Sequence, residues 1–353
     1  SFTARWRRPE ILLYLMAGAV PLSFATWQAL LNNFAIERAA FTGEEIGILQ
    51  SLREVPGFLA FAVVFLLIFI REQRLAFLSL LLLGIGTAIT GYFPSVLGLY
   101  VTTVIMSLGY HYYETLQISL SLQWLDKTRA PEVLGRIIAV GSFTSIVTFG
   151  LIWLGSEVLH LDFVWIYLVG GAATALVAAV CWWLFPIYEE KVRQHKRMVL
   201  RRRYWLYYAL IFMSGARRQI FIVFAGFLMV EKFGYDVSQI AMLFFLNAGL
   251  NILLSPRIGR MIGYWGERRA LVFEYCGLIG VFVAYAFVEN STLAAGLYVV
   301  DHLFFALAIA LKTYFQKIAD PRDIAATAGV GFTINHIAAV VLPAAFGFLW
   351  LVS

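Results

Sequence analysis

Eleven long apolar stretches follow one another along this chain, and they constrain its fold more than any other feature. A helix needs about 20 apolar residues to cross the hydrocarbon core of a bilayer, whereas membrane β-barrels use alternating segments of about ten. The spans are expected at residues 10–35, 45–70, 75–92, 97–124, 134–159, 163–185, 204–230, 239–262, 270–288, 293–315 and 324–352. The sequence therefore predicts an all-α polytopic membrane protein.

The composition agrees with this prediction and excludes several other classes of protein. Apolar residues make up 61% of the chain and charged residues 14%, whereas soluble domains are about half apolar and about a quarter charged. A soluble, disordered or collagen-like chain would not have this composition. The two cysteines, Cys181 and Cys276, lie far apart in apolar stretches, so they are interpreted as packing residues.

The basic residues predict how the chain is oriented in the membrane. Of the 27 Lys and Arg residues, 22 fall in one set of alternating loops and only Arg38 and Lys232 in the opposite set, while Arg53, Arg217 and Arg218 lie within spans. Cytoplasmic loops collect basic residues, so the N-terminus and the central loop are expected in the cytoplasm. The expected location is a bacterial inner (plasma) membrane. The formal net charge of +6 is thus explained without a nucleic-acid partner.

An internal repeat divides the chain into two halves. Pro131 and Pro321 open the fifth and eleventh spans, 190 residues apart, and each is followed nine residues later by a Val-Gly pair. Ile46 and Ile240 open the second and eighth spans at a similar offset of 194. A duplicated six-helix unit leaves such a pattern. The expected parts are a six-helix bundle at 1–187, a basic cytoplasmic linker at 188–203 and a five-helix bundle at 204–353, with a twelfth helix missing from this chain.

The stretch from Gly259 to Arg269 resembles the glycine-rich loop of the major facilitator superfamily, roughly G-x-L-x-D-R-x-G-R-R. Gly259, Gly266, Arg268 and Arg269 match this motif, while Gly263 stands where the family prefers Asp. The resemblance implies a secondary transporter built from two pseudo-symmetric six-helix bundles that rock about a central site. It also implies that the first, fourth, seventh and tenth helices line a central cavity.

Several polar side chains are expected at mid-depth in the spans, where charge is costly and usually functional. The candidates for a substrate and proton cavity are Gln28, Arg53, Glu54, His111, Glu114, Arg217, Arg218, Asp301 and His302. The repeat maps His111 onto Asp301, and the family resemblance implies that these two positions face each other across the cavity. The structural alternative is that such groups tie helices together. Glu274 is expected to reach the membrane interface or to pair there.

The chemistry of these candidates suggests the solute. Arg217 and Arg218 are adjacent, and arginine recognises carboxylate or phosphate groups through paired hydrogen bonds. A small anionic or zwitterionic organic solute is therefore expected. Glu114 is the candidate proton carrier, because a carboxyl group in a cavity that opens and closes can gain and lose a proton.

Other activities have weaker support in the sequence. His111 and Glu114 have metal-ligand spacing, but no second His or Cys pair completes a site, so no metal or cofactor is expected. No phosphate-binding loop and no His-Glu-x-x-His or other protease pattern is present, so the chain is not expected to be an enzyme. The expected partners are a small-molecule solute, the lipid bilayer and protons. The remaining alternative is a non-transporting member of the same fold that acts as a receptor or an assembly factor.

Overall fold

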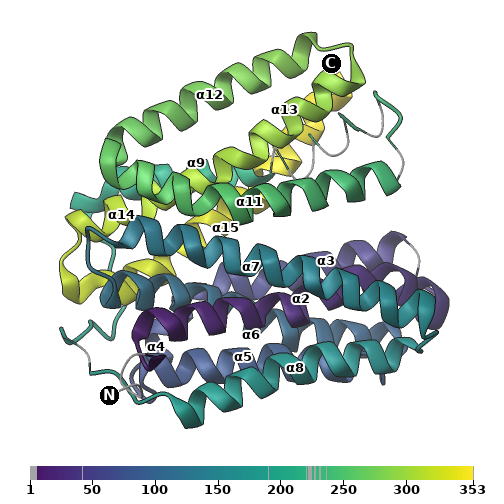
Figure 1. Ribbon diagram of the computed structural model, residues 1–353, viewed down its shortest axis with the longest axis horizontal. Coiled ribbons are helices and arrows are strands. Elements are labelled where there is room, and N and C mark those ends of the chain that lie inside the picture. The colour runs from purple at the N-terminus through teal and green to yellow at the C-terminus, as the bar shows by residue number, and fades with distance from the viewer. Residues whose placement is uncertain are drawn as a thin grey trace. The chain divides into compact units, whose positions relative to one another are not determined.

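The computed structural model describes residues 6–352 except 42, 190, 220, 222–224, 226–227, 230–231 and 236. All regular secondary structure in these residues is helical (Figure 1), which confirms the expected class. The expected end of the seventh span, Val230, lies outside the described residues.

The first six expected spans correspond to helices before the central linker. Their bounds are α2 (Pro9–Ala39), α3 (Gly43–Phe58), η1 (Leu59–Ala62), α4 (Val63–Leu66), α5 (Glu72–Thr90), α6 (Val96–Trp124), α7 (Ala130–Trp153), η2 (Leu154–Val158) and α8 (Phe163–Leu184). The second span is divided into α3, the short 3-10 segment η1 and α4. The fifth span ends in the π-helical turn η2.

The helices after the linker correspond to the remaining spans. Their bounds are η3 (Arg202–Tyr204), α9 (Trp205–Gln219), α11 (Val237–Trp265), α12 (Glu267–Phe287), α13 (Ser291–Phe304), η5 (Phe305–Ala308), α14 (Ile309–Ile318), η6 (Pro321–Asp323) and α15 (Ile324–Val352). The tenth span is divided by η5, a 3-10 segment between α13 and α14. Short 3-10 segments inside a helix often mark a functional position or a strained sequence.

Local sequence signals explain several helix ends. Asp162 accepts a hydrogen bond from the Val164 amide at 3.1 Å and so caps the start of α8. Asn290 caps α13 in the same way, accepting from the Thr292 amide at 2.9 Å. These side chains satisfy amides that have no partner within the helix. Gly266 separates α11 from α12 with a φ of 81°, a conformation that glycine adopts without strain.

The chain divides into two compact units, and α7 and α15 each contribute residues to both. Unit 1 comprises residues 1–124, 140–199 and 321–333, and unit 2 comprises residues 125–139, 200–320 and 334–353. The expected division into two bundles at residues 188–203 stays a prediction.

Close helix packing in unit 1 depends on small residues. A Cβ atom on Gly109 of α6 would lie 2.3 Å from the Leu83 nitrogen of α5. A Cβ atom on Gly171 of α8 would lie 2.3 Å from the Gly84 carbonyl oxygen. Without these glycines α5 could not approach α6 and α8 so closely, which is how small residues work at helix contacts in membranes.

In unit 2, glycines likewise allow close packing between the start of α7 and α11. A Cβ atom on Gly135 would lie 2.3 Å from the Ser255 carbonyl oxygen, and one on Gly259 would lie 2.2 Å from the Pro131 carbonyl oxygen. Gly259 of the predicted glycine-rich loop therefore has a packing function in this structure. Arg260, next to it, lies 3.9 Å from Glu132 on α7.

Eight helical segments are long and apolar enough to cross a membrane, counted over the residues that the structure describes. They are Pro9–Ala39, Ile48–Leu66, Glu72–Thr90, Ala130–Val158, Phe163–Leu184, Met242–Trp265, Glu267–Phe287 and Ser291–Ile318. α9 contains 15 residues before residue 220, which lies outside the described part of the chain, so α9 is not counted. α6 has 29 residues, but His111, Glu114 and Gln117 lower its hydropathy. The polar residues that reduce the hydropathy of α6 are among the candidate site residues.

Candidate functional site

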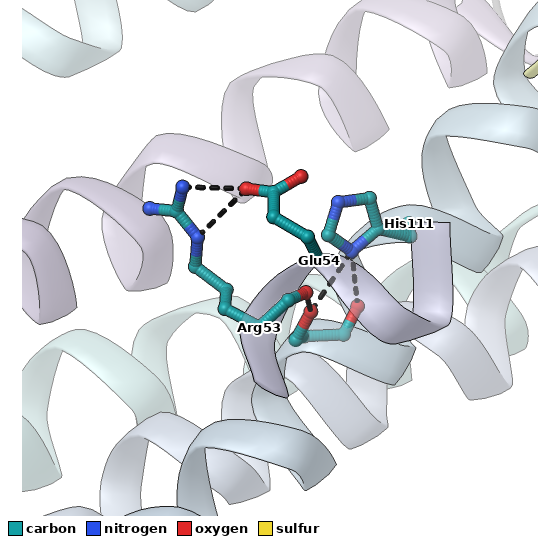
Figure 2. A network of polar contacts seen from close by, with 4 residues as sticks. Arg53, Glu54 and His111 are labelled. Atoms are coloured by element: carbon teal, nitrogen blue, oxygen red, sulfur yellow. Dashed lines mark hydrogen bonds and ion pairs between the residues drawn. The ribbon is translucent and has the colours of Figure 1, made fainter. Parts of the chain in front are cut away.

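Unit 1 contains a polar cluster formed by Arg53, Glu54, Ser107 and His111, here called the unit 1 cluster (Figure 2). Arg53 and Glu54 are neighbours on α3, and Ser107 and His111 are one turn apart on α6. The structure thus brings three of the predicted site residues, Arg53, Glu54 and His111, into one network.

Hydrogen bonds across two helices hold the unit 1 cluster together. Arg53 donates to Glu54 Oε1 through Nη2 at 2.6 Å and through Nε at 3.1 Å. The Ser107 hydroxyl donates to the Arg53 carbonyl oxygen, which joins α6 to α3. His111 Nδ1 lies 2.9 Å from both the hydroxyl and the carbonyl oxygen of Ser107. Since a carbonyl only accepts, these contacts assign the ring proton to Nδ1.

The unit 1 cluster is partly open to its surroundings. The side chains of Arg53 and Glu54 are 25% and 28% exposed, and Arg53 lies over the Trp27 ring with its guanidinium carbon 5.9 Å from the ring centroid. The buried His111 ring packs edge-on against Phe332. Figure 2 shows the Glu54 carboxylate beside the part of the imidazole that carries the other ring nitrogen. A carboxylate, a guanidinium and an imidazole therefore share a partly exposed site.

Two further predicted site residues in unit 1, Glu114 and Gln28, are less buried than His111. Glu114 lies one turn beyond His111 on α6 and is half-buried. Gln28 on α2 is exposed and has no hydrogen-bond partner among the described residues, so the structure does not bring it into the unit 1 cluster.

Unit 2 contains a second polar cluster, here called the unit 2 cluster and formed by Arg217, Asn251, Glu274, Asp301 and His302. Its members come from four helices: Arg217 from α9, Asn251 from α11, Glu274 from α12, and Asp301 and His302 from α13. The last two lie just before η5, the segment that divides the tenth span.

A buried ion pair lies at the centre of the unit 2 cluster. Arg217 Nη1 donates to Glu274 Oε1 at 2.6 Å, and each side chain is only 4% exposed. Arg217 Nη2 donates to the Asp301 carbonyl oxygen at 3.2 Å, and the guanidinium carbon lies 3.9 Å from the centroid of the Phe305 ring. These contacts engage both terminal nitrogens of a guanidinium group that would otherwise be very costly to bury.

The expectation for Glu274 holds only in part. It was expected to reach the membrane interface or to pair there, and it is paired with Arg217, but at 3% exposure it does not reach the surface. The physical reason is that Arg217 supplies a partner in the interior, so the carboxylate has no need to reach water. The rule that charge within a span is functional by default could have identified Glu274 as a site residue.

Asp301 is fully buried, and neither oxygen of its carboxyl group has a hydrogen-bond partner among the described residues. Asn247 of α11 is 1% exposed, and both of its amide atoms also lack partners there. His302 Nε2 lies 3.1 Å from Asn251 Nδ2, which is the donor, so the ring proton is again assigned to Nδ1. Asp301 of the unit 2 cluster, and Asn247 one turn before Asn251 on α11, thus have unused hydrogen-bonding capacity. This is rare for buried groups.

The remaining predicted residues are distributed over unit 2. Arg218 is half-buried beside Arg217. Gly266 lies between α11 and α12, and Arg268 and Arg269 are exposed in the first turn of α12. The predicted facing of His111 and Asp301 involves residues of different units and stays a prediction.

Comparison with known proteins agrees with this architecture. The chain resembles the crystal structure of the human organic anion transporter MFSD10 (TETRAN), with a TM-score of 0.75, 12% identity and coverage of 96% of this chain and 92% of that one. It also resembles a bacterial homologue of the iron transporter ferroportin in an outward-facing state, with a TM-score of 0.74, 13% identity and coverage of 97% and 92%. At such low identity these likenesses show the fold alone.

No curated protein matches the sequence. The family model of the Major Facilitator Superfamily, however, matches residues 11–343, nearly the whole chain. The expected family is thus confirmed, and this chain is an integral membrane protein that belongs to the Major Facilitator Superfamily of secondary transporters.

Proposed function

We propose that this protein moves a small anionic or zwitterionic organic solute across a bacterial inner membrane by alternating access, coupled to protons, with its N-terminus in the cytoplasm. The observation that carries the proposal is the unit 2 cluster, in which a buried arginine lies beside a buried carboxyl group that lacks a hydrogen-bond partner among the described residues.

Arg217 is the group proposed to recognise the anion. Its Nη atoms are engaged by Glu274 and the Asp301 carbonyl, while its Nε has no hydrogen-bond partner among the described residues. An arginine binds a carboxylate or phosphate best through two parallel hydrogen bonds. A substrate anion that displaces Glu274 would therefore gain a strong contact, and it would transfer the cost of an unpaired charge to Glu274.

Asp301 is the group proposed to carry the proton. An ionised carboxylate without a hydrogen-bond donor is costly in a medium that excludes water, so burial favours the neutral acid, while the nearby Arg217 favours the ionised form. Opening of the site to water would reduce the effect of burial by hydrating the carboxylate. Proton uptake and release at Asp301 would then accompany the conformational cycle. Glu114, half-buried on α6, remains the alternative carrier.

Two features support the remaining parts of the proposal. The distribution of basic residues over the loops favours a cytoplasmic N-terminus. The human structural relative is described as an organic anion transporter, which agrees with an anionic solute.

The test is uptake into proteoliposomes by the purified full chain. Labelled monocarboxylates, dicarboxylates, phosphate esters, zwitterions and cations would be offered with and without a pH gradient. Uptake of one anionic or zwitterionic class, increased by the gradient, is expected. Arg38→Gln is a suitable control variant, because it removes an exposed ion pair with Asp162. Uptake restricted to cations, or no response to the gradient, would contradict the proposal.

A further inference from the structure

Residues 186–189 and 191–199, which lie between α8 and η3 and are here called the linker segment, form one wall of a hollow of about 670 Å³ in unit 1. Four basic side chains of the linker segment, Lys191, Arg193, His195 and Lys196, line the hollow together with Arg322 of η6. This volume lies within the range of pockets that hold small organic ligands.

Hydrogen bonds attach the linker segment to the rest of unit 1. The side chain of Gln194 is buried, and its amide donates to the Pro321 carbonyl oxygen at 2.8 Å and accepts from the Ala325 amide at 3.1 Å. The His195 amide donates to the Arg322 carbonyl oxygen at 2.8 Å. These bonds hold the linker segment against η6 and the first turn of α15.

An apolar contact completes this attachment. Val199, near the end of the linker segment, is buried together with Val64 of α4 and Ala326 of α15. The hollow thus has walls from two parts of the sequence that are more than a hundred residues apart.

Three of the cations that line the hollow lack partners of opposite charge among the described residues. Lys191, Arg193 and Lys196 are exposed, and none of them forms an ion pair or hydrogen bond with any described residue. Asp323 is one nearby acidic group, but its buried carboxylate lies 3.6 Å from His195 Nε2. Glu72 and Glu189 line an adjacent hollow that shares Lys196, but neither forms an ion pair with it. Three uncompensated cations around one hollow create a strongly positive local potential.

Aromatic and basic side chains in the same unit indicate the depth of this region. The guanidinium carbon of Arg7 lies 5.0 Å from the Trp6 ring centroid, and that of Arg74 lies 5.7 Å from the Trp182 ring centroid. Tryptophan gathers at the boundary between lipid and water. Beside these residues, burial raises the pKa of Tyr188 to about 12 although Arg7 lowers it, so this hydroxyl adds no negative charge.

We propose that the hollow lined by Lys191, Arg193, Lys196 and Arg322 binds a phosphate group, either of an anionic phospholipid headgroup or of a free phosphate compound. Basic pockets at the cytoplasmic side of membrane helices bind phosphorylated headgroups. A bound phosphate would connect the linker segment to the start of α15 through charge-assisted hydrogen bonds. The site is separate from both polar clusters and does not depend on the transported solute.

The test measures lipid retention by the purified full chain with native mass spectrometry. Phosphatidylglycerol and phosphatidylcholine would be added at equal concentration, and inorganic phosphate would be titrated separately. The variant Lys191→Gln/Arg193→Gln/Lys196→Gln is expected to bind phosphatidylglycerol about a hundredfold more weakly, because each basic residue near a membrane surface contributes several-fold. The control variant, Lys127→Gln/Arg202→Gln/Arg257→Gln, removes three exposed cations of unit 2. Equal losses in both variants would overturn the proposal.

A second variant tests whether binding depends on the structure of the hollow or only on the total positive charge of this surface. Gln194→Ala removes no charge but breaks the bonds to Pro321 and Ala325. It is expected to weaken phosphatidylglycerol binding several-fold, and unchanged binding would overturn the proposal. If the triple variant does not fold, Arg193→Gln replaces it.

The inorganic phosphate titration identifies the source of the ligand. Displacement of phosphatidylglycerol by millimolar phosphate supports a site for soluble phosphate compounds. Phosphatidylglycerol binding that phosphate does not displace supports a headgroup site. Binding of neither phosphatidylglycerol nor inorganic phosphate to the wild-type chain would overturn the proposal.

Discussion

The unit 1 cluster and the unit 2 cluster each contain an arginine within an expected membrane helix, and each arginine is paired with a carboxylate in a different way. In unit 1, Arg53 pairs with its neighbour Glu54 on the same helix (Figure 2). About a quarter of each side chain is exposed. In unit 2, Arg217 pairs with Glu274 from another helix, and both side chains are almost fully buried. The first pair can separate at a lower cost because it is not fully buried. The second joins two helices and can separate only when another charge takes its place.

This difference predicts different roles for the two clusters. The unit 2 pair is a tie between α9 and α12 and, under the proposed function, a position where a substrate anion competes, so its loss should affect folding and transport together. The unit 1 pair is local, so its loss should leave the fold largely intact. The following experiments test this comparison, from the largest expected effect to the smallest.

The largest effect is expected for Arg217→Ala. Glu274 would be left buried without its partner, which costs about 3–5 kcal/mol when one member of a buried pair is removed. We expect a marked loss of thermal stability and no detectable uptake, measured on purified protein and in proteoliposomes.

The charge-neutral double variant Arg217→Met/Glu274→Gln separates the two functions. It removes both charges, so much of the stability should return, while uptake should remain absent because the anion has lost its ligand. Normal uptake in the double variant would show that the pair is only a tie.

The next effect is expected for Asp301→Asn, which keeps the shape of the buried side chain but cannot carry a proton. We expect gradient-driven uptake to stop while exchange of labelled for unlabelled solute at equal pH continues. Stability should change little because the neutral amide matches the neutral acid in size. The measurement compares both fluxes in the same proteoliposomes, and equal loss of both would exclude Asp301 as the proton carrier.

Glu114→Gln tests the alternative carrier and should have a smaller effect, because Glu114 is half-buried in α6 and lies outside the unit 2 cluster. Both fluxes are expected to fall modestly and by the same factor. If only gradient-driven flux stops, proton coupling belongs to unit 1 instead of unit 2.

The smallest effect on stability is expected for Glu54→Gln. A partly exposed pair of this kind contributes about 0.2–1 kcal/mol, so the melting temperature should stay close to that of the wild-type chain. A loss of stability as large as that of Arg217→Ala would show that the two clusters do not differ in the way described. Arg38→Gln, at the exposed pair with Asp162, provides the baseline for a surface ion pair.

Most of the fold could be predicted from the sequence because membrane helices depend on local properties. The expected span at 163–185 corresponds to α8 at Phe163–Leu184, since a long apolar run follows the capping residue Asp162. The breaks at η1 and η5 were not predicted, because hydropathy measures burial in lipid and is insensitive to the tightness of a helical turn.

The candidate site could be predicted only in part. Hydropathy placed Arg217 and Asp301 at depth, and the structure brings them together, with Arg217 Nη2 bound to the Asp301 carbonyl. It could not identify Glu274 as the partner of Arg217, because the two residues are 57 positions apart on different helices.

The sequence by itself determined that the chain is helical, that it is built for a membrane and which charges lie within the spans, because each of these depends on residue type and local spacing. Only the tertiary structure decided which charges meet. Burial of Arg217 with Glu274, and of Asp301 without a hydrogen-bond partner among the described residues, follows from the packing of α9, α12 and α13. Periodicity sets the face of a helix on which a side chain lies, but the neighbouring helix determines whether that side chain meets a charge, a ring or nothing polar at all.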